Sequence, residues 1–436
     1  MTDHSLIDHN ARIAQSASGT DRSSSALADS DRQVTDDTNN TVSAVNQAPS
    51  NESRQRFRGR VMAAAVMSLL LPLIVIHRLA FAFDRILFPR LARVQVQSPL
   101  FIVGLPRSGT TLCHRLMAQA SDRFTSMPLW ELLLAPALCE KYLIAGLAWM
   151  DRLIGSPAKK LIRFAERKFG GTQSAIHATS LESPEEDYLG LLPFGGCFLA
   201  VLIWPFHPSV WRLANIDHAS HSQRQRLLAA YKGLLQRHLA FRGHDLTVLS
   251  KNPSFTGWVH SLQETFPDMR LIGLRRDPVE SVPSQLSSLR DGFALFGHDV
   301  TDPRIVTGFV KLLRDDWHLL DQYLDTVHPD QYQLIPYREL IQADSEALLS
   351  LLQSFGYDIS DNDVERIEAA CAAARQYRSQ HHYQLSEFGL NATELQQQFF
   401  ATNRLSPRSS MASETSPETT IPHDENDDDR LSLISS

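Results

Sequence analysis

The sequence contains little cysteine and no clustered metal ligands. Its 436 residues include only four cysteines, Cys113, Cys139, Cys197 and Cys371, and none of them forms a C-x-x-C pair. A zinc site or a redox dithiol is therefore not expected; buried free thiols are the simplest interpretation, although one long-range disulfide stays open. With Gly at 20, Pro at 22 and 43% apolar residues, a collagen-like or wholly disordered chain is excluded. The length suits one large α/β domain or two ordinary ones.

The body of the chain also lacks a net charge of either sign. Residues 1–55 carry eight acids and four bases, and residues 403–436 carry seven acids and three bases, so these two ends account for the overall charge of −7. A near-neutral body has no electrostatic footprint for nucleic acid, and no nucleic-acid partner is expected. Both ends are rich in small polar residues and poor in large apolar ones, which predicts disordered tails.

One long apolar segment, residues 61–83, precedes the body. Its first sixteen residues are uncharged, enough for about 24 Å of helix against roughly 30 Å of hydrocarbon. We expect membrane association through this segment, with a tilted single span favoured and the arginines at 54–60 holding the N-terminus on the cytoplasmic side. Since Pro72, His77 and Arg78 interrupt the segment, an interfacial helix that leaves the body cytosolic, or a helix packed on the domain, stays open.

Short aliphatic runs alternate with helical patterns in the rest of the chain. The runs 100–103, 246–249, 269–274 and 331–335 are typical of buried strands. This alternation predicts an α/β fold with a central parallel sheet covered by helices on both faces, and ligands bind beyond the carboxyl ends of such strands. We therefore divide the chain into a tail, an apolar helix with its linker, one α/β domain and an acidic tail: 1–55, 56–92, 93–402 and 403–436.

The first candidate site is Gly-Leu-Pro-Arg-Ser-Gly-Thr-Thr at 104–111, directly after a predicted strand and before a helix. A Gly-x4-Gly turn ending at Gly109 brings backbone N–H groups around a phosphate, and the helix N-terminus adds positive potential. The hydroxyl groups of Ser108, Thr110 and Thr111 can donate to the same anion. A Walker A loop would carry Lys at position 110, which argues against an enzyme with the usual Lys–Mg²⁺ pair.

A second candidate anion site follows the run 269–274, in Arg-Arg-Asp-Pro-Val-Glu-Ser-Val-Pro-Ser at 275–284. Arg276 lies at the end of the strand and Ser284 lies eight residues further on, so both can converge on a second phosphate. Arg275 is expected to point elsewhere. Two separated phosphate sites on one sheet imply a nucleotide with phosphates at both ends of its ribose.

Taken together, these motifs resemble those of sulfotransferases that use 3′-phosphoadenosine 5′-phosphosulfate (PAPS). The loop 104–111 resembles that family's 5′-phosphosulfate loop and 275–284 its 3′-phosphate motif, and the similarity extends over about 99–345. The pair Trp130-Glu131 and the segment Lys251-Asn-Pro-Ser place the chain nearer the tyrosylprotein and large bacterial-type enzymes. This resemblance implies the P-loop-like sulfotransferase fold, PAPS as co-substrate, no metal, and a hydroxyl-bearing acceptor, which carbohydrate, lipid and tyrosine all satisfy.

Catalytic roles follow from the same resemblance. Lys251 and Arg107 would neutralise charge that develops on the leaving 5′-phosphate. Cytosolic sulfotransferases carry a His two residues after this Lys, where this chain has Pro253, so the base must come from elsewhere. We expect Glu131 to take the proton of the acceptor.

Acids at 182–187 are the rivals of Glu131 for the role of base. Within the segment 177–187, His177 and Glu185 are candidates to line the acceptor pocket, although Ser183-Pro184 followed by acids is also typical of a helix N-terminus. Near the end of the resemblance, Arg338 replaces the Glu of a Tyr-Glu-x-Leu signature, so no role is carried over to that position.

Two other functions remain open at this point. A nucleotide or small-molecule kinase with a degenerate phosphate loop would turn over ATP with Mg²⁺ and ignore PAPS. A membrane-tethered nucleotide-binding module without catalytic activity would bind 3′,5′-bisphosphoadenosine and yield no sulfated product. The sequence does not predict an oligomeric state.

Overall fold

The computed structural model describes residues 51–169, 181–342, 344–375 and 384–400. The predicted tails lie almost wholly outside these ranges, as does His177. Residues 51–55 are the exception, because they already belong to a helix.

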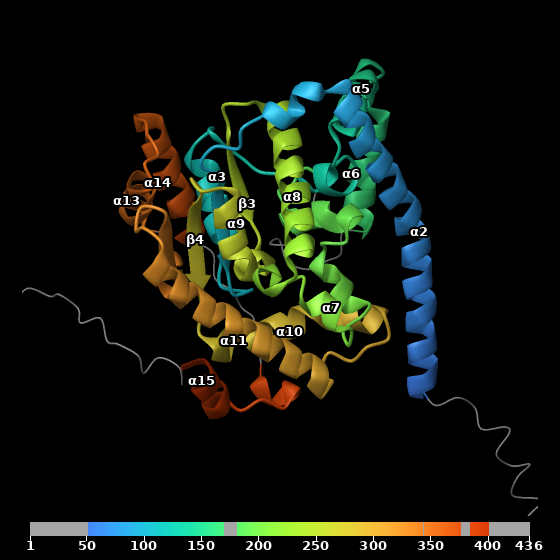
Figure 1. The fold of residues 1–436 in the computed structure, drawn as a ribbon, viewed down its shortest axis with the longest axis vertical. Coiled ribbons are helices and arrows are strands. Elements are labelled where there is room, and N and C mark those ends of the chain that lie inside the picture. Colours follow the sequence, from blue (N-terminus) through green and yellow to red (C-terminus); the bar gives the residue numbers. More distant parts are fainter. Residues whose placement is uncertain (1–50, 170–180, 343, 376–383, 401–436) are drawn as a thin grey trace, which may run out of the picture. The chain divides into compact units, whose positions relative to one another are not determined.

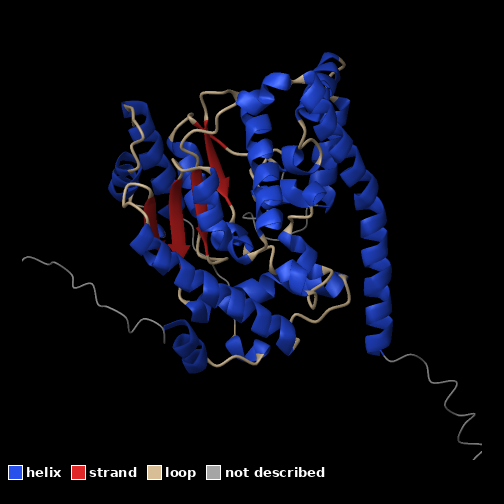
Figure 2. Cartoon of the chain, in the orientation of Figure 1, coloured by secondary structure: helices blue, strands red, loops and turns tan. Residues whose placement is uncertain are grey.

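A five-stranded parallel sheet lies between layers of helices, as Figure 2 shows. The strand order is β2-β3-β1-β4-β5, and every neighbouring pair is parallel. All four predicted strands are present, with ends within two residues of those expected, and the predicted fold class is confirmed. The sequence pattern missed β2, which has only two residues. The strands are β1 (Leu100–Gly104), β2 (Phe124–Thr125), β3 (Thr247–Lys251), β4 (Arg270–Arg275) and β5 (Tyr332–Pro336).

Each face of the sheet has its own apolar core. In β1, Phe101 and Val103 join one cluster while Leu100 and Ile102 join the other, as alternation along a strand requires. The first cluster includes side chains of α8 (His221–Arg242), α9 (Val259–Thr265), α10 (Pro278–Leu295) and α11 (Pro303–Thr326). The second includes side chains of α3 (Thr110–Ala120), α13 (Ser345–Ser354) and α14 (Asp361–Arg375). Figure 1 shows α13 and α14 on one side of the sheet and α8 on the other.

Shorter elements complete the fold around these layers. The remaining helices are α2 (Asn51–Leu87), α4 (Leu129–Leu133), α5 (Leu138–Leu153), α6 (Pro157–Phe169), α7 (Pro208–Trp211), α12 (Tyr337–Leu340) and α15 (Ala392–Phe400). The 3₁₀ turns are η1 (Pro89–Arg93), η2 (Asp187–Phe194), η3 (Phe198–Leu202), η4 (Ile216–His218), η5 (Pro253–Trp258) and η6 (Leu385–Phe388).

The expected apolar helix is α2. It runs unbroken for 37 residues through Pro72 and ends at Leu87. Within the described ranges it is the one helix whose length and composition would allow it to cross a membrane. The four cysteines are free thiols, and three of them are buried.

Candidate active site

Three adjacent strands end at one edge of the sheet and bring the predicted sites together. Gly104 ends β1 and lies in register with Leu274 of β4, while Lys251 ends β3 in register with Ile102. The loop 104–111, Lys251 and the turn after β4 therefore share this edge. This is the position at which open parallel sheets bind ligands.

Glycine is required at both ends of the loop. Gly104 has a φ of +134°, and a Cβ atom there would lie 2.1 Å from the carbonyl oxygen of Leu274. Gly109 has a φ of +90° and directly precedes α3, and a Cβ atom there would lie 2.8 Å from the side chain of Leu340. Because α3 begins at Thr110, the N–H groups of its first turn have no acceptor within the helix. The loop thus leaves backbone donors available to an anion.

The loop side chains differ in their exposure. Ser108 and Thr110 are buried, and the Ser108 hydroxyl donates to the carbonyl oxygen of Leu105. Thr111 is exposed. Arg107 has a φ of +66°, which is uncommon for a residue other than glycine. Such a backbone is often held in place for function.

Arg107 joins the loop to the second predicted anion site. Its Nε donates to Oγ of Ser284 at 3.2 Å, and its carbonyl oxygen accepts from Nη1 of Arg276 at 3.1 Å. The Arg276 guanidinium also pairs with Glu280 at 2.8 Å and lies 4.4 Å from the ring centroid of Tyr337. The structure therefore brings Arg107, Arg276 and Ser284 together.

A hollow of about 290 Å³ lies beside Arg276. Arg338, the residue at which the Tyr-Glu-x-Leu signature departs, also lines it. Arg275 lines the same hollow, where its guanidinium pairs with the carboxylate of Asp321 and stacks on the ring of Trp317. The lining residues are Arg275, Arg276, Asp277, Glu280, Trp317, Pro336, Tyr337, Arg338 and Phe400.

Lys251 lies beside two of the rival acids. Its Nζ is 3.3 Å from Oε1 of Glu186, and its side chain is buried. Glu185 is half-buried, and burial raises the pKa of its carboxyl above the ordinary value although the positive charge of Lys251 opposes the rise. The segment 181–185 is carried to this place by backbone hydrogen bonds to residues 127–130. Both Glu185 and Glu186 therefore belong to the surroundings of Lys251.

A buried polar network supports the end of β3. Tyr231 of α8 donates to the carboxylate of Asp187 at 2.7 Å, and its hydroxyl oxygen lies 3.1 Å from Oγ of Ser250. Burial raises the pKa of Asp187 to about 6, against the hydrogen bonds from Ser250 and Tyr231. Ser250 directly precedes Lys251, so the network fixes the backbone from which the lysine projects. No local sequence signal indicates the role of Tyr231 or Ser250, because only the packing of α8 against β3 brings the two side chains together.

Glu131 lies in a different buried cluster, formed with α5 and α8. Its Oε2 is 2.7 Å from Nζ of Lys141 and 2.8 Å from Nδ1 of His238, and its Oε1 accepts from Nε of Arg242 at 2.8 Å. Burial by itself raises the pKa of Glu131, but the hydrogen bond from His238 and the charge of Lys141 lower it to about 2. Only 1% of Glu131 is exposed. Both carboxylate oxygens are thus occupied, which favours a structural role; the three partners are far apart in sequence and gave no local signal.

Comparison with known proteins bears on the family and the fold. A family model described as "Sulfotransferase family" matches residues 99–361. The "Omega-hydroxy-beta-dihydromenaquinone-9 sulfotransferase Stf3" of Mycobacterium tuberculosis (strain CDC 1551 / Oshkosh) is 26% identical over 298 residues, covering 66% of this chain and 70% of that protein. The Mycobacterium bovis protein of the same name matches equally.

Two solved structures share the fold. The sulfotransferase STF9 from Mycobacterium avium has a TM-score of 0.60 at 20% identity, covering 76% of this chain and 81% of that one. The sulfotransferase STF1 from Mycobacterium tuberculosis H37Rv has a TM-score of 0.52 at 16% identity, covering 84% of this chain and 97% of that one. These likenesses concern the arrangement of helices and strands.

Proposed function

Since the chain belongs to the sulfotransferase family, we propose that it moves a sulfuryl group from PAPS to a hydroxyl group of an apolar, membrane-resident acceptor. The observation that carries the donor assignment is the double contact of Arg107, whose side chain reaches Ser284 and whose carbonyl oxygen binds Arg276. Two anion-binding turns that touch in this way are suited to opposite ends of one nucleotide.

The residues present fit the two ends of PAPS. At the 5′ end, the loop 104–111 offers the N–H groups of the first turn of α3 and the hydroxyl groups of Thr110 and Thr111, while Ser108 holds the loop by donating to the carbonyl oxygen of Leu105. At the 3′ end, Arg276 supplies a planar cation suited to a phosphate, and Ser284 supplies a buried hydroxyl. The kinase alternative is not favoured, because the chain belongs to a sulfotransferase family.

In the proposed reaction, the acceptor oxygen attacks sulfur in line with the bond that breaks. A new S–O bond forms, the old S–O bond to the 5′-phosphate breaks, and 3′,5′-bisphosphoadenosine leaves with the negative charge. Lys251 and Arg107 neutralise that charge as it develops. Glu186 pairs with Lys251 and thereby orients the ammonium group before the donor binds.

We assign the acceptor's proton to Glu185 in preference to Glu131. A base needs a carboxylate oxygen within hydrogen-bond reach of the acceptor, and its pKa is best close to the working pH. Glu185 is half-buried beside Lys251 and its pKa is raised, whereas Glu131 is buried, holds three basic side chains and has a lowered pKa. Asp187 helps to fix the position of Lys251, because it is linked through the hydroxyl group of Tyr231 to Ser250, the residue before Lys251.

The apolar nature of the acceptor is supported by two observations. The relatives named above act, by their names, on a hydroxylated dihydromenaquinone, which is a lipid-soluble molecule. In this chain, the apolar residues 61–83 form a helix whose outer face is exposed. Membrane association through this helix would bring the enzyme to acceptors dissolved in the bilayer.

A labelling experiment tests the proposal. The purified full-length protein is incubated with ³⁵S-labelled PAPS and, in parallel, with a lipid extract or an aqueous extract of the cells that make it. We expect label in a lipid product with the wild type and about 10²–10³-fold slower labelling with the Lys251→Ala variant. Label only in aqueous products would contradict the acceptor class. Mg²⁺-dependent ATP turnover without labelled product would contradict the donor.

A further inference from the structure

The outer face of α2 carries many exposed large apolar side chains, together with exposed arginines near its two ends. The helix has eleven large apolar side chains exposed between Phe57 and Leu87, including Leu69, Ile76 and Phe83. Its other face contacts the domain towards the two ends of the apolar segment, where Gly59, His77, Phe81 and Asp84 are buried at helical spacing. Between Gly59 and His77 this face is half-buried. So many exposed apolar side chains on one helix indicate that this face contacts an apolar partner.

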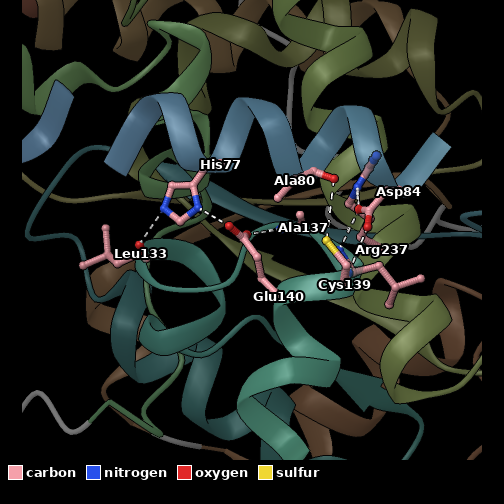
Figure 3. A network of polar contacts seen from close by, with 9 residues as sticks. His77, Ala80, Asp84, Leu133, Ala137, Cys139, Glu140 and Arg237 are labelled. Carbon is pink, nitrogen blue, oxygen red and sulfur yellow. Dashed lines mark hydrogen bonds and ion pairs between the residues drawn. The ribbon is translucent and has the colours of Figure 1, made fainter. Parts of the chain in front are cut away.

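The covered face is fastened to the catalytic domain by specific polar contacts, which Figure 3 shows. Asp84 accepts hydrogen bonds from the first N–H groups of α5, those of Leu138 and Cys139, at 2.7 and 2.9 Å, and from Nε of Arg237 at 2.8 Å. The ring nitrogens of His77 lie 2.7 Å from Glu140 and 3.1 Å from the carbonyl oxygen of Leu133. The end of α2 near Leu87 is therefore an integral part of the domain.

The other end of α2 also touches the domain. A Cβ atom on Gly59 would lie 2.2 Å from the carbonyl oxygen of Phe296, so the helix passes directly over the end of α10. From Gly59 to Asp84 the helix rises about 38 Å, more than the roughly 30 Å of a bilayer's hydrocarbon layer. Contacts at both ends thus bracket the whole apolar segment. If α2 crossed the membrane in this arrangement, the flank of the catalytic domain would have to enter the hydrocarbon with it.

Two further helices extend the apolar surface of α2. Helix α5, which contacts α2 through Asp84 and His77, exposes large apolar groups that include Leu147 and Trp149, and α6 exposes Leu161 and Ile162. The exposed parts of residues 56–93 and 138–165 are called the α2–α5–α6 surface here. Of the 29 large apolar side chains that are exposed among the described residues, 21 belong to this surface. Such a concentration marks an interaction site.

The exposed charges carried by the residues of the α2–α5–α6 surface are positive, and one exposed carboxylate from outside them, that of Glu182, lies 3.9 Å from Nζ of Lys159. Ten basic side chains are exposed on this surface, among them Arg58, Arg85 and Lys160. None of its acidic side chains is exposed, because Asp84 is buried and Glu140 and Asp151 are half-buried. The rest of the domain must balance this excess, since residues 56–402 are close to neutral. Exposed apolar groups flanked by cations fit a bilayer that contains anionic lipids.

We propose that the α2–α5–α6 surface docks the enzyme onto one leaflet of an anionic bilayer, with α2 lying in the membrane plane and not spanning it. The catalytic domain then stays wholly on one side of the membrane. This inference concerns binding alone and does not depend on the identity of the donor or the acceptor.

Vesicle flotation tests whether the protein binds an anionic bilayer. We expect the full-length protein to float with vesicles of phosphatidylcholine that contain roughly one third phosphatidylglycerol, and more weakly with phosphatidylcholine alone. The double variant Lys160→Glu/Arg163→Glu should bind anionic vesicles at least about 25-fold more weakly. The double variant Leu147→Glu/Trp149→Glu should bind both kinds of vesicle at least about tenfold more weakly than the wild type. Binding of these variants equal to that of the wild type would overturn the proposal.

Matched controls separate the surface from general effects of substitution. Lys311→Glu and Leu324→Glu alter an exposed base and an exposed apolar residue on α11, outside the surface, and should float like the wild type. The melting temperature of each variant checks its folding independently of any sulfuryl transfer. A stable dimer without lipid that the Leu147→Glu/Trp149→Glu variant converts to a monomer would assign the surface to a second copy of the chain and overturn the proposal.

Nitroxide labels measure whether α2 lies in the plane or spans. Labels are placed on Leu69→Cys, Ile76→Cys and Phe83→Cys, which are exposed positions along the helix. In-plane docking predicts similar depths for all three, about 5–10 Å below the headgroups. A profile in which position 76 is deepest and the two ends are shallow would show a span and overturn the proposal.

Discussion

The carbonyl oxygen of Arg107 accepts a hydrogen bond from Nη1 of Arg276 at 3.1 Å, across a separation of 169 residues. The two residues belong to different turns, one after β1 and one after β4, and these strands are neighbours in the sheet. Each turn offers its own set of anion donors. Their contact is the geometric basis for assigning both to one donor nucleotide.

Replacing Lys251 tests the stabilisation of the leaving group. The Lys251→Ala variant should lose about 10²–10³-fold in kcat, because a preorganised cation at the developing charge is worth that much in other enzymes. Its affinity for 3′,5′-bisphosphoadenosine should change much less. Single-turnover kinetics and calorimetry measure the two quantities; an unchanged kcat would remove Lys251 from the reaction.

The Glu185→Gln variant tests the proposed base. We expect a loss of about 10²–10⁴-fold in kcat, the usual contribution of a positioned base. The Glu131→Gln variant should retain turnover at temperatures where it is folded. The opposite result, with Glu131→Gln inactive and Glu185→Gln active, would return the role of base to Glu131.

The pH profile gives a second test of Glu185. Burial raises the pKa of this carboxyl above its ordinary value of 4.5, and the active form of a base is the carboxylate. Activity should therefore fall as the pH drops through the raised pKa, earlier than for an exposed glutamate. The acid limb of kcat/KM against pH should disappear in the Glu185→Gln variant. If the limb persists, another group controls it.

Stability, in contrast, should depend on Glu131. Its folded pKa of about 2 lies below the ordinary 4.5, so it stabilises the fold above pH 4.5 and loses that effect as the pH falls towards 2. The shift corresponds to about 3 kcal/mol at neutral pH. Glu131→Gln should lower the free energy of unfolding in urea by about 3–5 kcal/mol at pH 7, because buried cations lose their partner.

The control for this measurement is Glu182→Gln. Glu182 is exposed, and its Oε1 lies 3.9 Å from Nζ of Lys159. Exposed ion pairs of this kind contribute less than about 1 kcal/mol to the free energy of unfolding. The difference between wild type and Glu131→Gln should also shrink as the pH falls. A difference that does not change between pH 7 and pH 3 would assign the loss to packing and not to charge.

Local signals in the sequence predicted the sheet and the anion loops. Strands buried on both faces read as aliphatic runs, and Gly104 and Gly109 mark backbone conformations that few other residues adopt. The contact between Arg107 and Arg276 could only be inferred from the parallel order of strands. Nothing local indicated β2, which has two residues and pairs with β3 at the edge of the sheet.

Buried side-chain clusters were beyond the reach of sequence patterns. Glu131 was predicted to be the base because it follows the loop 104–111 at a position similar to that of the catalytic Glu in tyrosylprotein sulfotransferases. Its neighbours in space are instead Lys141, His238 and Arg242, which are distant from it in the sequence. In α2, Asp84 lies just beyond the apolar run 61–83, and nothing in the sequence marks it as a contact with the domain. Its actual partners, the first N–H groups of α5 and Arg237, depend on how three helices pack.

The most direct test of the central claim measures nucleotide affinity for the wild type and the Arg276→Ala variant, with Arg290→Ala in α10, the helix that follows Arg276, as control. Calorimetry with 3′,5′-bisphosphoadenosine and with adenosine 5′-phosphate isolates the 3′ end. We predict that Arg276→Ala binds the bisphosphate about 10–100-fold more weakly, because it loses charge-assisted hydrogen bonds, and binds the monophosphate as the wild type does. Equal losses for both nucleotides, or no loss for either, would contradict a donor held at both ends.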